Sequence, residues 1–288
     1  MTGVALPVPA LQGLLDDAAV FPPGNASLSA AVAAHRDHRT SRYRDLVGPL
    51  VLPATALAGL APLLRAGEAL AVSITLPDGP DGIAGVLAQV ADLPVDLTAV
   101  EVAVPAELTA EDLRTRLDRH SAGAGVDVIV EIPRSAERDR VLAAVAGRFR
   151  VKLRTGGVRA DLYPDEAELA GTIRAVTAAG CPFKATAGLH HAIRNTDPNT
   201  GFEQHGFLNL VLAAAVAAEP RVAEEATVAA LAERDGGVVA AWIRNLGPER
   251  LRAARARLTS FGTCSITEPV DELVALGLLE PPGEAVHA

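Results

Sequence analysis

The chain of 288 residues is poor in aromatic side chains, in cysteine and in positive charge. Only 3% of its residues are Phe, Trp or Tyr, so a core must be built mainly from Ala, Val and Leu, as in helices packed on a sheet. The formal net charge of −9 argues against binding to nucleic acid or to an anionic membrane, because both need a basic face. Cys181 and Cys264 lack the number and spacing of a zinc site or a disulfide framework.

Long apolar runs are also missing. Residues 46–64 carry no charge, but three prolines and two glycines interrupt them, which argues against a transmembrane helix. The first fifteen residues lack the basic segment that opens a signal peptide. Together with two cysteines that read as reduced thiols, this predicts a cytoplasmic protein.

Lysine is the scarcest charged residue. Lys and Arg together number 26, and only Lys152 and Lys184 are lysine. Arg can replace Lys as a solvated charge but not as an amine nucleophile, because guanidinium stays protonated. Either the two lysines survived by chance, or they are retained for amine chemistry.

Short apolar runs rich in β-branched residues alternate with longer stretches of helical period. The pattern predicts strands at residues 17–21, 50–53, 71–76, 99–104, 126–132, 149–153, 183–187 and 258–262. It predicts helices from about residue 27, over 55–66, 81–91 and 109–119, from about residue 135, and over 165–179 and 268–277. This alternation predicts one (β/α)₈ TIM-barrel domain over 1–288. A doubly wound sheet would alternate too, but no G-x-G-x-x-G follows the first strand.

The segment 195–257 interrupts the alternation between the seventh and eighth strands. It contains a polar loop, Asn195 to His205, and at least two predicted helices. In a barrel such an insertion lies over the active-site mouth, where it forms a lid, or it serves as an oligomer contact. The sequence leaves both alternatives open.

Three strand ends combine polar residues with glycine: Lys152–Gly157, Lys184–His191 and Gly262–Ser265. Catalytic groups of barrels come from C-terminal strand ends, where glycines let backbone amides approach an anion. Because side chains alternate along a strand, Lys152 and Arg154 share one face, which we expect to be the lumen. Clustered cations lower each other's pKa, which frees an amine for nucleophilic attack. The alternative is that both lysines are ordinary ion-pair partners.

Single carboxylates interrupt otherwise apolar strands at Glu101 and Glu131. A buried strand cannot hold a charge without a partner, so we expect both to point into the lumen. Glu101 is a candidate proton shuttle, Glu131 is equally well a structural ion-pair partner, and Asp16 is a further candidate at the first strand.

Histidines follow the seventh strand. His190 or His191, with Glu203 and His205, could supply metal ligands, although adjacent histidines in a strand point to opposite faces. The preferred interpretation has no metal, and one histidine hydrogen-bonds the substrate.

The three strand ends resemble those of deoxyribose-phosphate aldolase, a family of class I aldolase barrels. That family has Lys-Thr-Ser-Thr-Gly, Lys-x-x-Gly-Gly-x-Arg and Gly-x-Ser-Ser on strands six to eight, and this chain has K-L-R-T-G from Lys152, K-A-T-A-G-L from Lys184 and G-T-C-S from Gly262. The similarity extends to Leu15-Asp16, to the turn at 73–79 and to 100–102, where the family has Val-Asp-Val. Outside 195–257 it covers most of the chain.

The resemblance implies an aldolase or lyase in which Lys152 forms a Schiff base, Lys184 lowers the pKa of Lys152, and Glu101 moves protons. Arg154 in place of Ser, Glu101 in place of Asp, the histidine pair and Cys264 depart from the pattern, which puts the family's substrate in doubt. We expect a small carbonyl substrate carrying a carboxylate or phosphate. Its predicted binding residues are Asp16, Glu131, Arg154, Thr155, Gly156, Gly188, His190, Gly262 and Ser265.

The sequence predicts no cofactor and is compatible with a homo-oligomer. Two other functions stay open at this point. One is a metal-dependent barrel lyase or hydrolase that uses His190, His191 or His205. The other is a non-catalytic barrel that binds a partner.

Overall fold

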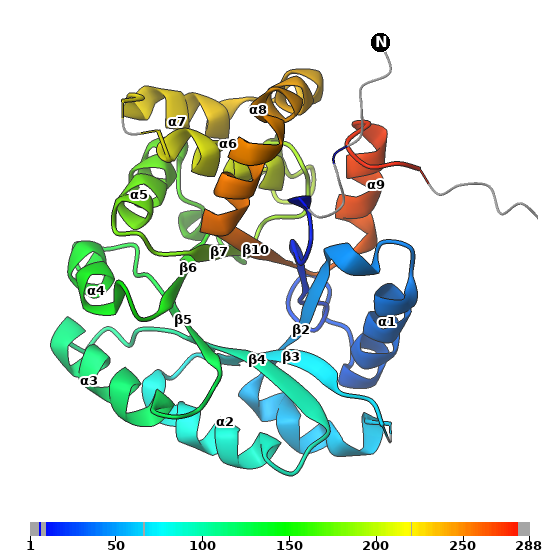
Figure 1. The fold of residues 1–288 in the computed structure, drawn as a ribbon, viewed down its shortest axis with the longest axis vertical. Coiled ribbons are helices and arrows are strands. Elements are labelled where there is room, and N and C mark those ends of the chain that lie inside the picture. The colour runs from blue at the N-terminus through cyan, green and yellow to red at the C-terminus, as the bar shows by residue number, and fades with distance from the viewer. Residues whose placement is uncertain (1–5, 7–9, 66, 220, 282–288) are drawn as a thin grey trace, which may run out of the picture.

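A computed structural model describes residues 6, 10–65, 67–219 and 221–281. Among these residues, eight parallel strands close a barrel in the order β1-β10-β7-β6-β5-β4-β3-β2 (Figure 1). The strands are β1 (Leu15–Asp17), β2 (Val47–Pro53), β3 (Leu70–Leu76), β4 (Val95–Val102), β5 (Asp127–Glu131), β6 (Arg150–Arg154), β7 (Phe183–Thr186) and β10 (Leu258–Thr263). The predicted (β/α)₈ barrel is confirmed.

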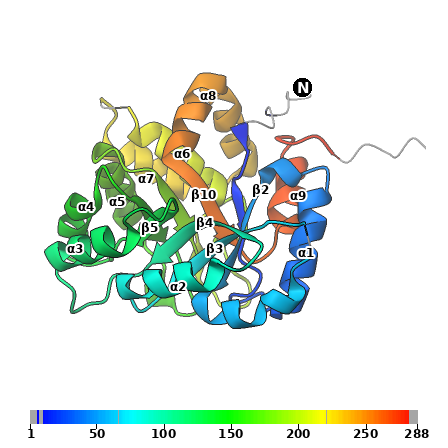
Figure 2. The same cartoon turned by 60° about the horizontal axis from the view of Figure 1, so that its bottom comes forward.

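Helices surround the strand ring in both views (Figures 1 and 2). Those that follow the strands directly are α1 (Leu28–Thr40), α2 (Ile83–Val90), α3 (Ala110–Ser121), α4 (Arg138–Val145), α5 (Glu166–Ala178) and α9 (Thr267–Ala275). Ser27, Thr109 and Asp165 start their helices because each side-chain oxygen accepts a hydrogen bond from a backbone amide of the first turn.

Two predicted elements differ. The first strand covers 15–17 rather than 17–21, because the chain turns after Asp17 and Phe21 donates its amide hydrogen to the Ala18 carbonyl. The predicted helix 55–66 is replaced by two short 3₁₀ segments, Ala54–Gly59 and Ala61–Leu63. Pro62 has no N–H to donate, so an α-helix cannot continue through it. Residue 66 of that prediction, and residues 1–5 and 7–9 of the N-terminal segment, lie outside the described residues.

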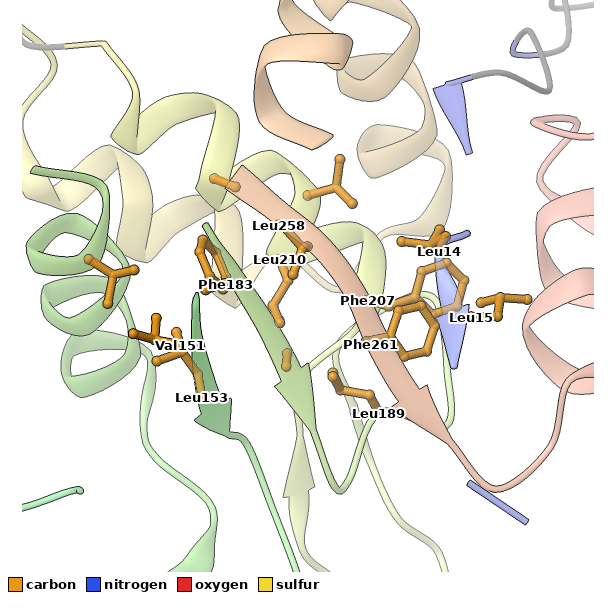
Figure 3. Close-up of a cluster of buried hydrophobic side chains, with 14 of the residues drawn as sticks. Leu14, Leu15, Val151, Leu153, Phe183, Leu189, Phe207, Leu210, Leu258 and Phe261 are labelled. Carbon is orange, nitrogen blue, oxygen red and sulfur yellow. The ribbon is translucent and has the colours of Figure 1, made fainter. Parts of the chain in front are cut away.

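The strands alternate between an apolar outer face and a polar lumen. Val151, Leu153 and Phe183 point outward into the hydrophobic layer beneath the helices (Figure 3). Lys152 lies between Val151 and Leu153, and Lys184 follows Phe183, so both lysines point inward. Both lysines are buried, with side chains 7% and 2% exposed.

The segment 195–257 divides into two parts. A hairpin of β8 (Asn195–Thr196) and β9 (Glu203–Gln204) comes first, followed by α6 (Phe207–Ala217), α7 (Glu224–Ala232) and α8 (Gly236–Arg257). Helix α6 packs against β10, and Phe207 stacks on Phe261 at 4.8 Å between ring centroids (Figure 3). Helix α6 thus belongs to the outer layer of the barrel, whereas residues of the hairpin segment line the cavity at the strand ends.

Across the described ranges, no helix is both long enough and apolar enough to cross a membrane.

Candidate active site

A cavity of about 640 Å³ lies at the C-terminal ends of the strands. Its floor carries the charged residues that the strand pattern predicts to point inward. They are Glu101, Glu131, Lys152, Arg154 and Lys184.

The two lysines are joined through one carboxylate. Lys152 Nζ donates to Glu101 Oε2 at 3.1 Å, and Lys184 Nζ donates to Glu101 Oε1 at 2.7 Å. Each lysine also has a carboxylate of its own: Glu131 Oε2 lies 2.9 Å from Lys152 Nζ, and Asp16 Oδ2 lies 2.5 Å from Lys184 Nζ. The floor is therefore a continuous chain of alternating charges.

Strand register explains this order. Glu131, Lys152 and Lys184 are paired across β5, β6 and β7, so their side chains lie at one level of the barrel. Two hydroxyls complete the network, since Ser73 donates to Glu101 Oε1 and Ser260 donates to Asp16 Oδ2, both at 2.8 Å. Fully buried carboxylates are tolerated only with such partners.

The sequence predicts that the clustered cations lower each other's pKa, but the pKa of Lys184 is raised. Burial by itself would lower the pKa of Lys184, but the attraction of Asp16 and Glu101 outweighs it and raises that pKa above its ordinary value. Burial alone would likewise raise the pKa of Glu101, yet Lys184 and Lys152 hold it far below the ordinary range. The Glu101 carboxylate, which lies between the two lysines, offsets the mutual repulsion of the cations. Lys184 is a charged partner of Glu101 and reaches Lys152 only through that carboxylate.

The pKa values of Asp16 and Glu131, the carboxylates at the two ends of this network, are shifted in opposite directions. Burial raises the pKa of Asp16 even though Lys184 lies beside it. Burial also opposes ionisation of Glu131, but Lys152 and Arg154 overcome it and lower the pKa. Arg154 Nε donates to Glu131 Oε1 at 2.8 Å, so Glu131 is shared between Lys152 and Arg154.

Acid is expected to destabilise the protein through Glu101. Because its pKa is lower in the folded state, its stabilisation is complete above about pH 4.5, the ordinary value, and is lost as the pH falls further. Glu131 acts in the same direction, whereas Asp16, with its raised pKa, opposes it. We expect the melting temperature to fall by about 5 °C between pH 6 and 3, for a loss of about 2 kcal/mol.

Calorimetric scans of Glu101→Gln supply the control. This variant is less stable than the parent at pH 6 but should show a flatter dependence on pH. An equally steep dependence in the variant would assign the acid sensitivity to other groups.

The predicted anion-binding loops are only partly at the cavity. Gly188 and Gly262 line it, but Thr155, Gly156 and Ser265 do not. The Thr155 hydroxyl donates to the carbonyls of Thr186 and Ala187, at 3.1 and 2.7 Å. Ser265 donates its amide hydrogen to Thr263 Oγ1 and accepts from the Glu268 amide, so it caps the start of α9. These residues hold the strand ends in place rather than meeting a ligand.

Gly156 has a packing reason to be glycine. A methyl group there would lie 2.7 Å from Tyr163 Cε1 and 2.9 Å from the Gly188 Cα. We expect Gly156→Ala to lower the free energy of unfolding by about 1–3 kcal/mol, measured by urea denaturation. Gly85→Ala is the matched control, because nothing lies within 4 Å of its added methyl group in α2, and it should stabilise by about 0.5–1 kcal/mol. Equal effects at the two sites would refute the packing argument.

The histidines do not converge. His190 lines the cavity, whereas the His191 ring turns away and lies 2.6 Å from Glu272. His205 is fully buried beneath the hairpin beside the Pro164 carbonyl and Arg194, and burial lowers its pKa to about 4. Glu203 pairs with Arg194 and Arg234. Within the described parts of the chain, no three His, Cys, Asp or Glu residues are placed to hold a metal ion.

Strand-end motifs missed the upper wall of the cavity, which is apolar. It comes from loops after several strands and from the hairpin: Phe21, Pro22, Pro77, Leu162, Tyr163 and Phe202. Tyr163 and Phe202 pack together with their ring centroids 5.4 Å apart. The sequence feature that could have indicated this apolar wall is that aromatic residues, which are rare in this chain, occur close to strand ends. The sequence assigned Cys264 no role in the site, yet this residue lines the cavity and its Sγ lies 3.4 Å from His190 Nδ1.

Comparison with known proteins gives a similarity of structure. No protein-family model and no curated protein matches the sequence. Among solved structures, deoxyribose phosphate aldolase from Aeropyrum pernix superposes with a TM-score of 0.54 over 92% of each chain, at 14% identity. This chain has the fold of a deoxyribose phosphate aldolase. The resemblance to this family is thereby confirmed at the level of the fold.

A weaker match is nitroalkane oxidase from Streptomyces ansochromogenes. It aligns with 92% of this chain and 98% of its own at 17% identity, and its TM-score is 0.38.

Proposed function

We propose that this aldolase-like barrel is a lyase that forms an imine between Lys152 and a small carbonyl compound and then breaks or makes a carbon–carbon bond. One observation carries the proposal. The chain has two lysines, and both side chains reach the same cavity, joined by Glu101. Lysine is the side chain that combines with a carbonyl group to form an imine.

Proton transfers in this reaction have local partners. Lys152 Nζ must lose a proton before it attacks, and Glu101 and Glu131 lie within 3.1 Å to receive it. Attack on the carbonyl carbon gives a carbinolamine, whose hydroxyl leaves as water once it is protonated. The resulting iminium accepts the electron pair of the breaking carbon–carbon bond. A carboxylate, directly or through water, takes the proton from the hydroxyl group on the β-carbon, and that oxygen becomes the carbonyl oxygen of the departing aldehyde or ketone. Protonation of the enamine and hydrolysis return free Lys152.

Lys184 has a different role in this scheme. Its Nζ is held between Asp16 and Glu101, and the Lys184 side chain is 2% exposed. A lysine fixed by two carboxylates keeps its charge and orients Glu101 toward Lys152. We therefore assign Lys184 as a positioning residue and Lys152 as the nucleophile.

Borohydride reduction tests the proposal. Incubation with aldehydes and ketones followed by borohydride should leave one reduced adduct, which peptide mass spectrometry locates at Lys152. The background on other side chains is low because the only other lysine is Lys184. No adduct across a broad carbonyl panel, with ordinary reactivity of both lysines, would instead support a non-catalytic barrel.

Two further properties of the protein, its oligomeric state and its location in the cell, also remain proposals. Self-association is one, because the similar aldolase is described as tetrameric, and sedimentation measurements test it. The cytoplasmic location predicted from the sequence is the other.

A further inference from the structure

The upper part of the cavity has an apolar surface, which a polar sugar phosphate would not contact favourably. Apolar side chains meet above the charged floor from the loops after β1, β3 and β6 and from the hairpin. Val158 stands at this mouth with 73% of its surface exposed, which makes it one of the two large hydrophobic residues that are exposed in the described chain. An exposed apolar wall around a polar floor is typical of a site for a ligand with an apolar body.

Charge balance at the cavity also disfavours an anion. The described residues that line it include three cations, Lys152, Lys184 and Arg154, and three carboxylates, Glu101, Glu131 and Asp197. Burial lowers the pKa of His190, so this ring adds no cation near neutral pH. A phosphate dianion would enter a site with no excess positive charge, and part of its desolvation would remain uncompensated.

The amide cradle expected for a phosphate is incomplete as well. The Thr155 amide donates to the Thr186 carbonyl at 2.9 Å, and the Ser265 amide donates to Thr263 Oγ1. Neither residue lines the cavity. Two of the groups that the sequence assigned to an anion are therefore already used inside the protein.

We propose, on the basis of the imine chemistry above, that the substrate is an uncharged aldehyde or ketone whose body is apolar, aromatic or branched. The carbonyl group enters first and reaches Lys152 on the floor. The apolar body then rests against the aromatic side chains that line the cavity, Phe21, Tyr163 and Phe202. This replaces the carboxylate or phosphate that the sequence predicts for the substrate.

A matched series of benzaldehydes tests the inference. The 4-isopropyl, 4-carboxylate and 4-phosphate derivatives present the same carbonyl and ring but differ in the charge at the far end. Rates of borohydride trapping on Lys152 are divided by the rates of the same aldehydes with butylamine in solution. The corrected rate for the isopropyl compound should exceed that for the phosphate by about tenfold or more, the effect of about 1.4 kcal/mol.

Binding without imine formation separates this inference from the proposed function. The corresponding benzyl alcohols cannot form an imine, and calorimetry should still show the isopropyl alcohol binding about tenfold more tightly than the phosphate. Tighter binding of the phosphate overturns the inference and leaves the imine chemistry intact. Preferential binding of the apolar alcohol without any trapped adduct supports the cavity argument and contradicts the lyase proposal.

A charge introduced at the mouth provides the positive control. Val158→Arg should improve binding of the phosphate alcohol by about fivefold at low salt, and the gain should vanish at high salt. Val158→Gln, which is polar but uncharged, should give no such gain. If the parent binds the phosphate alcohol more tightly than the isopropyl alcohol and Val158→Arg gives no further gain, the cavity already has the positive charge that we infer to be absent, and the inference fails.

Discussion

Lys152→Arg is expected to abolish the borohydride-trapped adduct and to lower kcat/KM for carbon–carbon cleavage by about 10⁴-fold or more. Arginine keeps the positive charge between Glu101 and Glu131, so the ion pairs of the cavity floor persist. It cannot act as the amine, because guanidinium does not lose its proton near neutral pH. The loss should therefore come from chemistry and not from folding.

Three measurements make this prediction specific. The Arg variant should melt within a few degrees of the parent, and peptide mass spectrometry should show no adduct on the peptide that contains residue 152. Lys184 remains as the single lysine of the variant and should stay unmodified, since its side chain is 2% exposed and held by two carboxylates. An adduct on Lys184 in the variant, with retained turnover, would reverse the roles assigned to the two lysines.

Lys184→Met should lower the free energy of unfolding by about 3–5 kcal/mol. Methionine fills a similar volume but leaves Asp16 and Glu101 buried without their shared cation. Removal of one partner from a buried ion pair costs more than the pair contributes, because the remaining charge keeps its desolvation penalty. Urea denaturation at pH 7 measures the change.

Two further variants test the cause. Adding Asp16→Asn to Lys184→Met should recover part of the lost stability, because the amide is uncharged and can still bind Ser260. Arg159→Met breaks an ion pair with Asp161 whose side chains are 69% and 63% exposed, and should leave the urea midpoint unchanged. If Lys184→Met is as harmless as Arg159→Met, the buried network does not stabilise the fold.

The direction in which each strand side chain points could be predicted from the sequence. The alternation of apolar and polar residues in 149–153 and 183–187 is local, so it placed Lys152 and Lys184 on the lumen side without knowledge of any contact. The same logic placed Glu101 and Glu131 beside them, because a carboxylate in an apolar strand needs a partner. The scarcity of lysine, visible in composition alone, directed attention to the two residues that share the cavity.

Tertiary structure decided what depends on residues far apart in the chain. Lys184 pairs with Asp16 across 168 positions and with Glu101 across 83, and no local pattern determines which carboxylate a lysine meets. Local sequence also does not determine that Ser265 caps α9 instead of facing a ligand. Nor does it determine that Phe207 of α6 packs against Phe261 of β10. The apolar cavity wall combines side chains from several loops, so it exists only once the barrel has closed. Local alternation determines which way a strand residue points, whereas its partners are set by barrel closure, which brings distant strands into register.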